Sequence, residues 1–275
     1  MSPDESDAPM AAAVDFAALY DEHPDYVARR QRDSFEQSQI DIEVQLFKLP
    51  NLLALLPEAR TVGSALEIGC ATGELIAGFP VRDGGRKVGM DISAANIAAA
   101  QERFPQVAFR CADFRALADE RFDVVILSDV LEHVPDDVDM LRAAAALADT
   151  VLVNLPLEDN WLNRRRRYGS DDVSGHLRKY SLAQGLALVK SAGLVATAHR
   201  QIWVHETNTE SARRALRRER CGSAYSGTWR RRWLSQAVFA AAIAVRPLGR
   251  RLFASNLFIA ARPATAFPAA HGSAP

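Results

Sequence analysis

Two carboxylates and a histidine crowd one short segment of this chain, where they could transfer a proton or bind a metal ion. Asp129, Glu132 and His133 fall within residues 128–135, directly after an apolar run. Imidazole titrates near neutral pH, so His133 is a candidate catalytic base. The three side chains could instead hold a divalent ion, but they underfill an octahedral one. We therefore expect that this segment binds no metal ion. If a metal ion does bind, Asp129, Glu132 and His133 would be its ligands. A purely hydrogen-bonding role for His133 within its loop is the third alternative.

A second histidine, His176, lies in a glycine-containing segment at residues 174–181. It could accept a proton from a substrate hydroxyl, which makes it the second candidate catalytic residue. Alternatively, His176 and Arg178 hold this loop in place by hydrogen bonds. A hydroxyl nucleophile needs a base more than an amine or carbon nucleophile does. Two histidines therefore favour an oxygen acceptor.

The elements that must position these residues form a repeated pattern of strands and helices. Helices are expected over residues 93–104, 136–149 and 181–191, and a helical segment over residues 16–56 with a break at Pro50. Strands are expected over residues 65–68, 87–91, 107–113, 121–129, 150–155, 194–204 and 256–262. This alternation predicts an α/β fold with parallel strands. Such sheets bind ligands at the carboxyl ends of their strands, where Asp91, Asp113 and Ser128 stand.

The loop after the first strand indicates the kind of ligand. The strand carries the acidic Glu67, and the loop that follows is bounded by Gly69 and Gly73 before a helix opens. Gly69 permits a positive φ, and Gly73 allows a ligand close to the backbone. A pyrophosphate site avoids a nearby anion, whereas a cationic ligand tolerates one. The loop therefore favours a cationic nucleoside, and a plain strand-turn-helix junction is the alternative.

This loop resembles the first motif of class I S-adenosylmethionine-dependent methyltransferases. Glu67, Gly69 and Gly73 match the E-x-G-x-G-x-G positions, and Ala71 replaces the middle glycine. The resemblance implies a Rossmann-like, seven-stranded, mostly parallel sheet with helices on both faces and an antiparallel last strand beside the sixth. It also implies S-adenosyl-L-methionine as cofactor. The cofactor-binding residues that we expect are Glu67, Gly69, Cys70, Ala71, Gly73, Asp91, Ile92, Ala112, Asp113, Phe114 and Ser128. Within this set, Asp91 would bind the ribose hydroxyls, Ile92 would lie against the adenine and Asp113 would recognise its amino group.

The catalytic segments carry the same resemblance. Residues 128–135 are similar to a stretch of small-molecule methyltransferases, including the O-methyltransferases of ubiquinone biosynthesis, some of which bind a divalent ion with an acidic-x-x-Glu-His arrangement. Residues 174–181 resemble the Gly-His-x-Arg-x-Tyr/Phe stretch of the family. We divide the chain into an N-terminal helical cap with a disordered start (1–60), the methyltransferase core (61–204), a basic helical insertion (205–255), the last strand (256–262) and a disordered tail (263–275). The cap would cover the substrate side of the sheet or simply pack against the sheet edge.

Charge and composition limit the partners. The 33 basic and 34 acidic residues leave a net charge of -1, so the whole chain has no electrostatic attraction to nucleic acid. Arginines 164–167 could receive a phosphate or carboxylate of the acceptor, or remain solvated. Residues 230–251 join arginines and Trp233 to an apolar stretch, which predicts either peripheral membrane contact or a helix buried on the sheet. Three cysteines without C-x-x-C spacing and an acidic N-terminus fit a reducing, cytoplasmic location.

The sequence thus predicts a cytoplasmic S-adenosylmethionine-dependent methyltransferase, with membrane association through the basic insertion as a possible addition. It would transfer a methyl group to the oxygen of a small-molecule or lipid-linked acceptor. One alternative is a scaffold module that binds the nucleoside without turnover. The other is an RNA or DNA methyltransferase, which we consider unlikely because the basic segments lack interleaved aromatic residues and any nucleic-acid-binding motif.

Overall fold

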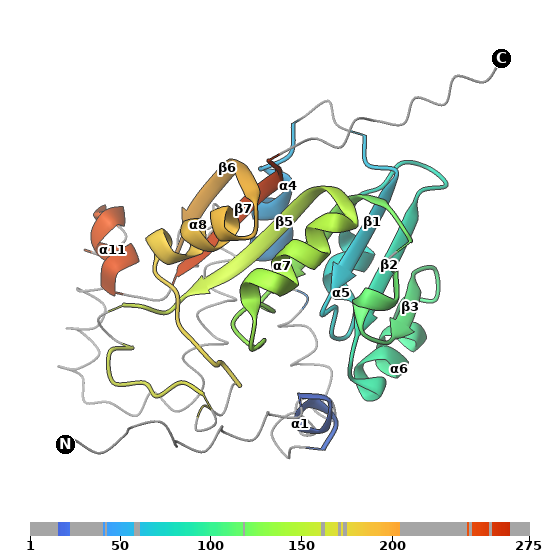
Figure 1. The fold of residues 1–275 in the computed structure, drawn as a ribbon, viewed down its shortest axis with the longest axis horizontal. Coiled ribbons are helices and arrows are strands. Elements are labelled where there is room, and N and C mark those ends of the chain that lie inside the picture. Colours follow the sequence, from blue (N-terminus) through green and yellow to red (C-terminus); the bar gives the residue numbers. More distant parts are fainter. Residues whose placement is uncertain are drawn as a thin grey trace, which may run out of the picture.

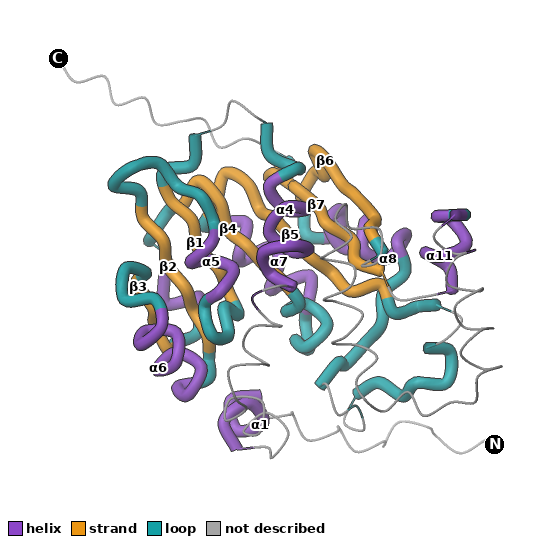
Figure 2. Tube along the Cα trace, turned by 180° about the vertical axis from the view of Figure 1, so that it is seen from behind, coloured by secondary structure: helices purple, strands orange, loops and turns teal. Residues whose placement is uncertain are grey.

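A seven-stranded sheet forms the centre of the molecule in the computed structural model (Figure 1). The structure describes residues 16–22, 41, 43–57, 61–117, 119–160, 163–169, 172, 175–203, 241, 244–252 and 255–264. The strands lie side by side in the order β3-β2-β1-β4-β5-β7-β6, with β3 and β6 at the two edges (Figures 1 and 2). This order, with helices on both faces, is the expected Rossmann-like arrangement.

The elements follow the chain in a regular alternation after the N-terminal helices. In order they are α1 (Phe16–Glu22), the π-helical segment η1 (Val44–Lys48), α4 (Leu49–Leu53), β1 (Ser64–Ile68), α5 (Glu74–Gly78), β2 (Arg86–Asp91), α6 (Ala94–Arg103), β3 (Ala108–Cys111), the 3-10 segment η2 (Phe114–Leu117), β4 (Phe122–Ser128), α7 (Asp137–Ala146), β5 (Ala148–Leu157), α8 (Leu182–Ser191), β6 (Leu194–Ile202), α11 (Arg246–Leu252) and β7 (Ser255–Pro263).

Strand pairing confirms the expected directions. β1 pairs in parallel with β2 and β4, and the parallel sheet continues to β3 on one side and β5 on the other. β7 is antiparallel to both β5 and β6, and it lies between them. β4 and β5 read as nearly continuous apolar runs because helices cover both faces of this central part of the sheet.

The sheet separates the core into two layers. Along β4, Val125 and Leu127 face the layer that contains α7 and α8, whereas Val124 and Ile126 face the layer that contains α4, α5 and α6. All four side chains are fully buried. The period of two along the strand therefore supplies apolar contacts to both layers.

The helical segment over residues 44–53 packs on a face of the sheet and continues through Pro50, so for this segment neither the break at Pro50 nor packing at the sheet edge is correct. The first helix, α1, contacts α6 instead. Pro50 stands in the first turn of α4, where its missing N–H leaves no hydrogen bond unmade. Phe47 is fully buried, and its ring centroid lies 5.4 Å from that of Phe258 on β7, at an interplanar angle of 77°. α4 contacts β5 and β7 near the middle of the sheet.

Two other predicted boundaries need correction. The helix expected over residues 136–149 ends at Ala146, and β5 already begins at Ala148. The third strand is shorter than expected, because the Asp113 side chain accepts a hydrogen bond from the Arg115 N–H as the chain enters η2. The start of the N-terminal cap, the tail after residue 264 and residues 204–240 of the insertion lie outside the described residues.

Part of the segment expected to contact a membrane belongs to the structure as α11, whose last turn carries Arg250 and Arg251. Within the described residues, no helix combines the length and the apolar character needed to cross a bilayer. Residues 230–240 of the same segment are not described. Peripheral membrane contact through residues 230–251 therefore stays a prediction.

Candidate functional site

A cavity of about 680 Å³ opens at the carboxyl ends of the parallel strands. Its wall includes Glu67 and Ile68 from β1, Asp91 from β2, Ala112 after β3 and Ser128 from β4. This is the edge at which open α/β sheets bind ligands, and the volume suits a nucleoside-sized molecule. The strands therefore bring together side chains that are far apart in the sequence.

Most of the predicted cofactor-binding residues line this cavity. They are Glu67, Gly69, Cys70, Ala71, Asp91, Ile92, Ala112, Asp113, Phe114 and Ser128. Gly73 does not line it and has a different structural reason to be glycine. Its φ is +86°, and a Cβ there would lie 2.6 Å from the Phe109 ring. We expected Gly73 to allow a ligand close to the backbone, but the group that lies close to it is the Phe109 ring of β3.

Backbone hydrogen bonds hold the loop after β1 against β2. The N–H groups of Gly69 and Cys70 both donate to the Met90 carbonyl, over 2.8 and 2.9 Å. Gly69 adopts a φ of +74° and Ala71 a φ of +45°. Ala71 therefore occupies the left-handed region that the family's glycine enters at no steric cost. Ala71, which replaces the middle glycine of the motif, therefore adds backbone strain to this loop.

Two backbone N–H groups fix the side chain of Asp91. Its Oδ2 accepts from the Ala71 N–H over 2.9 Å, and its Oδ1 accepts from the Ser93 N–H over 2.8 Å. Burial raises the pKa of Asp91, and these two hydrogen bonds only partly oppose the rise. Each carboxylate oxygen can accept a second hydrogen bond, so Asp91 can also receive a pair of ribose hydroxyls.

Glu67 is almost fully buried beside the same loop. Its Oε2 accepts a hydrogen bond from the Ile76 N–H of α5 over 2.9 Å. Burial raises the pKa of Glu67 to about 8, against the opposing effects of the Ile76 hydrogen bond and the Lys48 charge. A cation placed near Glu67 would favour its charged form. The carboxyl groups of Glu67 and Asp91 thus fit a positively charged nucleoside better than a pyrophosphate.

Lys48 enters the site from the N-terminal helices. Its Nζ lies 3.0 Å from Asp129 Oδ2 and 3.6 Å from Glu43 Oε1. Burial lowers the pKa of Lys48, but the charges of Asp129 and Glu43 raise it by more, so the ammonium stays charged. Asp129 also accepts from the Asn154 side chain over 2.9 Å and adopts a φ of +56°. Asp129 is therefore committed to contacts with neighbouring side chains.

The two predicted catalytic histidines lie against each other. The ring centroids of His133 and His176 are 4.7 Å apart, and the rings are perpendicular. They meet because two segments are joined: the Leu177 N–H donates to the Glu132 carbonyl over 2.8 Å, and the Arg178 guanidinium donates to the Val134 and Pro135 carbonyls. Arg178 thus holds the loop, as the alternative hypothesis has it, and both histidines line the cavity.

The pair differ in their partners. His133 Nδ1 lies 3.1 Å from the Gly175 carbonyl oxygen, so this nitrogen carries the proton and Nε2 is the acceptor. Burial and then the neighbouring His176 lower the pKa of His133 to about 4. His176 Nδ1 lies 2.7 Å from Glu158 Oε2, and Glu158 is itself bound by Arg166. A carboxylate can only accept, so His176 also presents Nε2 as an acceptor.

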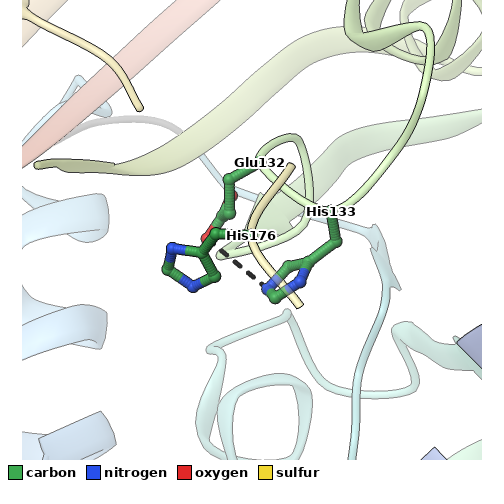
Figure 3. Close-up of side chains that lie close together, drawn as sticks. All are labelled: Glu132, His133 and His176. Atoms are coloured by element: carbon green, nitrogen blue, oxygen red, sulfur yellow. Dashed lines mark ion pairs between the residues drawn. The ribbon is translucent and has the colours of Figure 1, made fainter. Parts of the chain in front are cut away.

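The candidate metal ligands are rearranged relative to the sequence expectation. Ligand atoms of Glu132, His133 and His176 lie within 4.8 Å of one another, and Figure 3 shows the three side chains together. Asp129 is not part of this group within the described residues, because it turns to Lys48. The proposed set of Asp129, Glu132 and His133 is therefore not assembled around one point.

Residues 66–149 match the family model described as a methyltransferase domain. A ubiquinone biosynthesis O-methyltransferase of Bradyrhizobium sp. (strain ORS 278) is 31% identical over 162 residues, which are 50% of this chain and 64% of that protein. A protein of the same name from Rhodopseudomonas palustris (strain HaA2) is 37% identical over 103 residues, 35% of this chain and 40% of that one. A trans-aconitate 2-methyltransferase of Variovorax paradoxus (strain S110) is 36% identical over 112 residues, 38% and 41% of the two chains. The chain spans less than two thirds of the length of these relatives.

The chain contains a methyltransferase domain over residues 66–149.

Solved structures resemble the methyltransferase domain and its surroundings in fold. Magnesium protoporphyrin IX methyltransferase from Synechocystis PCC 6803, crystallised with SAH, has a TM-score of 0.52 and 16% identity, covering 90% of this chain and 98% of that one. The [4+2]-cyclase SpnF has a TM-score of 0.52 and 18% identity, covering 84% of both chains. Such identities show the fold alone, and one of the two neighbours is a cyclase. The chemistry must therefore be argued from the residues of this site.

Several site residues lie outside the segment that matches the methyltransferase domain, and sequence reasoning missed two of them. Glu158 directly follows β5, so the rule that found Asp91 at the end of β2 could have found it. Lys48 had no comparable signal, because it belongs to a helix whose position over the cavity depends on tertiary packing. Arginines 164–167 were expected either to receive an anion or to remain solvated, and Arg166 does neither in this structure, because it binds Glu158 and Asp172.

Proposed function

We propose that this protein transfers a methyl group from S-adenosylmethionine to the oxygen of a small-molecule or lipid-linked acceptor. The observation that supports this best is the pairing of His176 with Glu158 at the rim of a nucleoside-sized cavity. A carboxylate that holds one imidazole nitrogen leaves the other available as a base. The acidic residues along the cavity wall suit a cationic sulfonium, which supplies a methyl group on a good leaving group when bound.

The binding part of the proposal depends on Asp91 and the loop after β1. Asp91 would accept from the ribose hydroxyls while it keeps its bonds to the Ala71 and Ser93 N–H groups. Ile92 is 44% exposed although it borders the cavity, so an adenine ring can cover it. Glu67 provides a buried carboxyl beside the loop, and Asp113 and Phe114 border the same end of the cavity.

The catalytic part of the proposal assigns the proton to His176. Its Nε2 would take the proton of the acceptor hydroxyl, and Glu158 would stabilise the imidazolium that forms. His133 stays neutral near pH 7 and would orient the pair through its hydrogen bond to the Gly175 carbonyl. Holding the hydroxyl in line with the methyl group supplies much of the remaining acceleration.

The proposal is tested by incubating the protein with labelled S-adenosylmethionine and a metabolite extract, followed by identification of the labelled product. We expect one class of hydroxyl-bearing product. His176→Asn should lower the initial rate about 10²- to 10⁴-fold, the usual contribution of a positioned base. Isothermal titration should show unchanged cofactor affinity in the same variant.

Two outcomes would contradict the proposal. Cofactor binding without any labelled product would support the scaffold alternative, and a labelled amine or carbon atom would remove the assignment to oxygen. A lipid-linked acceptor remains within the proposal and predicts a labelled product in the organic phase of the extract. A nucleic-acid acceptor predicts label in the RNA or DNA fraction and binding that weakens steeply with salt.

A further inference from the structure

A second cavity of about 380 Å³ adjoins the first one. The two cavities share Lys48, Asp129 and His176 in their walls. The proposed base therefore faces both spaces, and a molecule in the second cavity would reach His176 from the side away from Asp91. If the proposed function holds, this second cavity is where the acceptor binds.

The second cavity is rich in carboxyl groups. Its wall contains Glu43, Asp129, Glu132 and Glu158, against the single charged amine of Lys48. Lys48 is already engaged by Asp129 and Glu43. Burial and the charge of Asp129 raise the pKa of Glu132, so the charged groups that an anion would face are the carboxylates of Glu43, Asp129 and Glu158, which is electrostatically unfavourable.

The nearby guanidinium does not change this balance. Arg166 binds Glu158 and also donates to both oxygens of Asp172, over 2.6 and 2.9 Å. Its charge is thus divided between two carboxylates that it already contacts. The opposite wall, from β7, adds Ser255 and Asn256, which carry no charge.

Glu132 gives the cavity its most specific feature. Its side chain is 1% exposed, and neither carboxyl oxygen has a hydrogen-bond partner among the described residues. The Nε2 atom of the neutral His133 ring lies 3.8 Å from Glu132 Oε1, which is beyond hydrogen-bond distance. A buried polar group without a hydrogen-bond partner costs free energy. A ligand that donates a hydrogen bond to Glu132 would therefore remove this cost and bind more tightly.

We propose that the second cavity binds a hydrogen-bond-donating, non-anionic part of the acceptor, a hydroxyl or an ammonium group, with Glu132 as the receiving residue. Carboxylate- and phosphate-bearing groups are excluded from this end of the site. A site built around a buried acceptor rejects analogues that lack the donor, because the acceptor then stays unpaired. Glu132 is thus a specificity-determining residue for the acceptor.

The test uses three probes of similar size that differ in their head group: butylammonium, 1-butanol and butyrate. Each is titrated into the protein saturated with S-adenosylhomocysteine, and binding is followed by saturation-transfer NMR. We expect butylammonium and 1-butanol to bind, and butyrate to bind about tenfold more weakly or not at all. Competition between the two binders would show that hydroxyl and ammonium use the same place.

Variants of Glu132 connect this preference to one side chain. Glu132→Leu should weaken both butylammonium and 1-butanol about tenfold, whereas Glu132→Gln should weaken butylammonium and retain 1-butanol. The exposed Glu102, replaced by Gln, is the matched control and should change neither. If Glu132→Leu does not fold, as thermal unfolding would reveal, the ratio of the two affinities in Glu132→Gln decides the question.

Three outcomes would overturn the inference. Butyrate could bind as tightly as the other probes, or the Glu132 variants could leave all affinities unchanged. Alternatively, Mn²⁺ alone could bind in a Glu132-dependent way while the organic probes do not, which would make this a metal site. Failure of S-adenosylhomocysteine to bind would instead remove the proposed function, so the two failures are distinguishable.

Discussion

His133 and His176 touch each other, yet their surroundings prepare them for different tasks. His133 donates to a backbone carbonyl and has a pKa lowered to about 4, so it is a weak base. His176 donates to the Glu158 carboxylate, which can stabilise a positive charge on the ring. The sequence predicts both histidines as candidate catalytic residues, and only their tertiary contacts show that their surroundings differ.

This difference predicts unequal effects of replacing the two histidines. His133→Asn should lower the rate of methyl transfer less than about tenfold, because an amide is neutral like His133 and can still donate to Gly175. The rate with labelled S-adenosylmethionine and the extract acceptor measures the effect beside that of His176→Asn. A larger loss in His133→Asn than in His176→Asn would exchange the assigned roles.

Glu67 makes the free energy of unfolding fall as the pH rises from about 4.5 to about 8. Burial raises its pKa from the ordinary value of 4.5 to about 8 in the folded protein, so the folded state holds a proton that the unfolded state has lost. Its stabilising contribution is complete below pH 4.5 and is lost as the pH rises through about 8. We expect Glu67→Gln to keep about 2 kcal/mol or more of unfolding free energy that wild type loses between about pH 5 and 9.

Urea denaturation of both proteins at several pH values measures this difference, with Glu102→Gln as the surface control. If the unfolding free energy changes with pH in the same way for wild type and Glu67→Gln, then Glu67 ionises normally in the folded protein. His133 acts in the opposite direction: with its pKa lowered to about 4, its contribution to stability is complete above pH 6.5 and is lost as the pH falls through about 4.

At the scale of elements, local signals near helix starts were reliable. The sequence predicts helices that begin at Ser93 and Ser181, and each serine accepts the backbone hydrogen bond that an N-cap makes, from Asn96 and Gln184. These signals depend on neighbours within four residues, so the sequence alone contains them. No local sequence signal of this kind places the helix that contains Lys48. Its place over the cavity depends on the packing of Phe47 against Phe258 of β7, which is far along the chain.

The capping box at Ser181 gives a prediction for α8. Ser181→Ala should lower the unfolding free energy by about 1 kcal/mol, because the Gln184 N–H loses its acceptor. Ser191, at the other end of the same helix, is exposed and serves as the matched control. Chemical denaturation measures both variants, and equal losses in Ser181→Ala and Ser191→Ala would show that the cap contributes nothing.

The loop after β1 gives a second prediction at this scale. Ala71→Gly should raise the unfolding free energy by about 0.5 to 1 kcal/mol, because Ala71 has a φ of +45° and glycine enters this region without strain. Gly73→Ala should do the reverse and cost more, since its Cβ would also meet Phe109. Thermal unfolding ranks the three proteins. A destabilised Ala71→Gly would mean that glycine's flexibility in the unfolded chain outweighs the strain.

The whole molecule consists of two apolar layers divided by the sheet. Ile76 of α5 and Leu141 of α7 are fully buried on opposite sides. Because the two layers share few direct contacts, Ile76→Val should cost about 1 kcal/mol, Leu141→Ala about 2 to 5 kcal/mol, and the double variant their sum within about 0.5 kcal/mol. Urea denaturation measures the four proteins. A double variant far from the sum would indicate that the sheet transmits strain between the layers.

The fold and the strand-end residues that line the first cavity were predictable because each depends on short-range patterns. Strand ends such as Asp91 and Ser128 and the loop at Gly69 carry their own signals, and a parallel sheet gathers them at one edge. The second cavity was less predictable, since it combines Lys48, Glu158 and His176 from three separate segments. The ion pairs of Arg166 were missed for the same reason, because its carboxylate partners Glu158 and Asp172 come together only in the folded chain.

The position of β7 has a consequence for how the protein is made. A ribosome releases β5 and β6 well before β7, which follows β6 only after residues 203–254 and then fits between the two. At common translation rates this delay lasts about 3 to 10 s, and during it both earlier strands keep a row of unsatisfied N–H and C=O groups. The nascent chain thus passes through an interval in which a neighbouring polypeptide can occupy the gap, and holdase chaperones would be most useful at that moment.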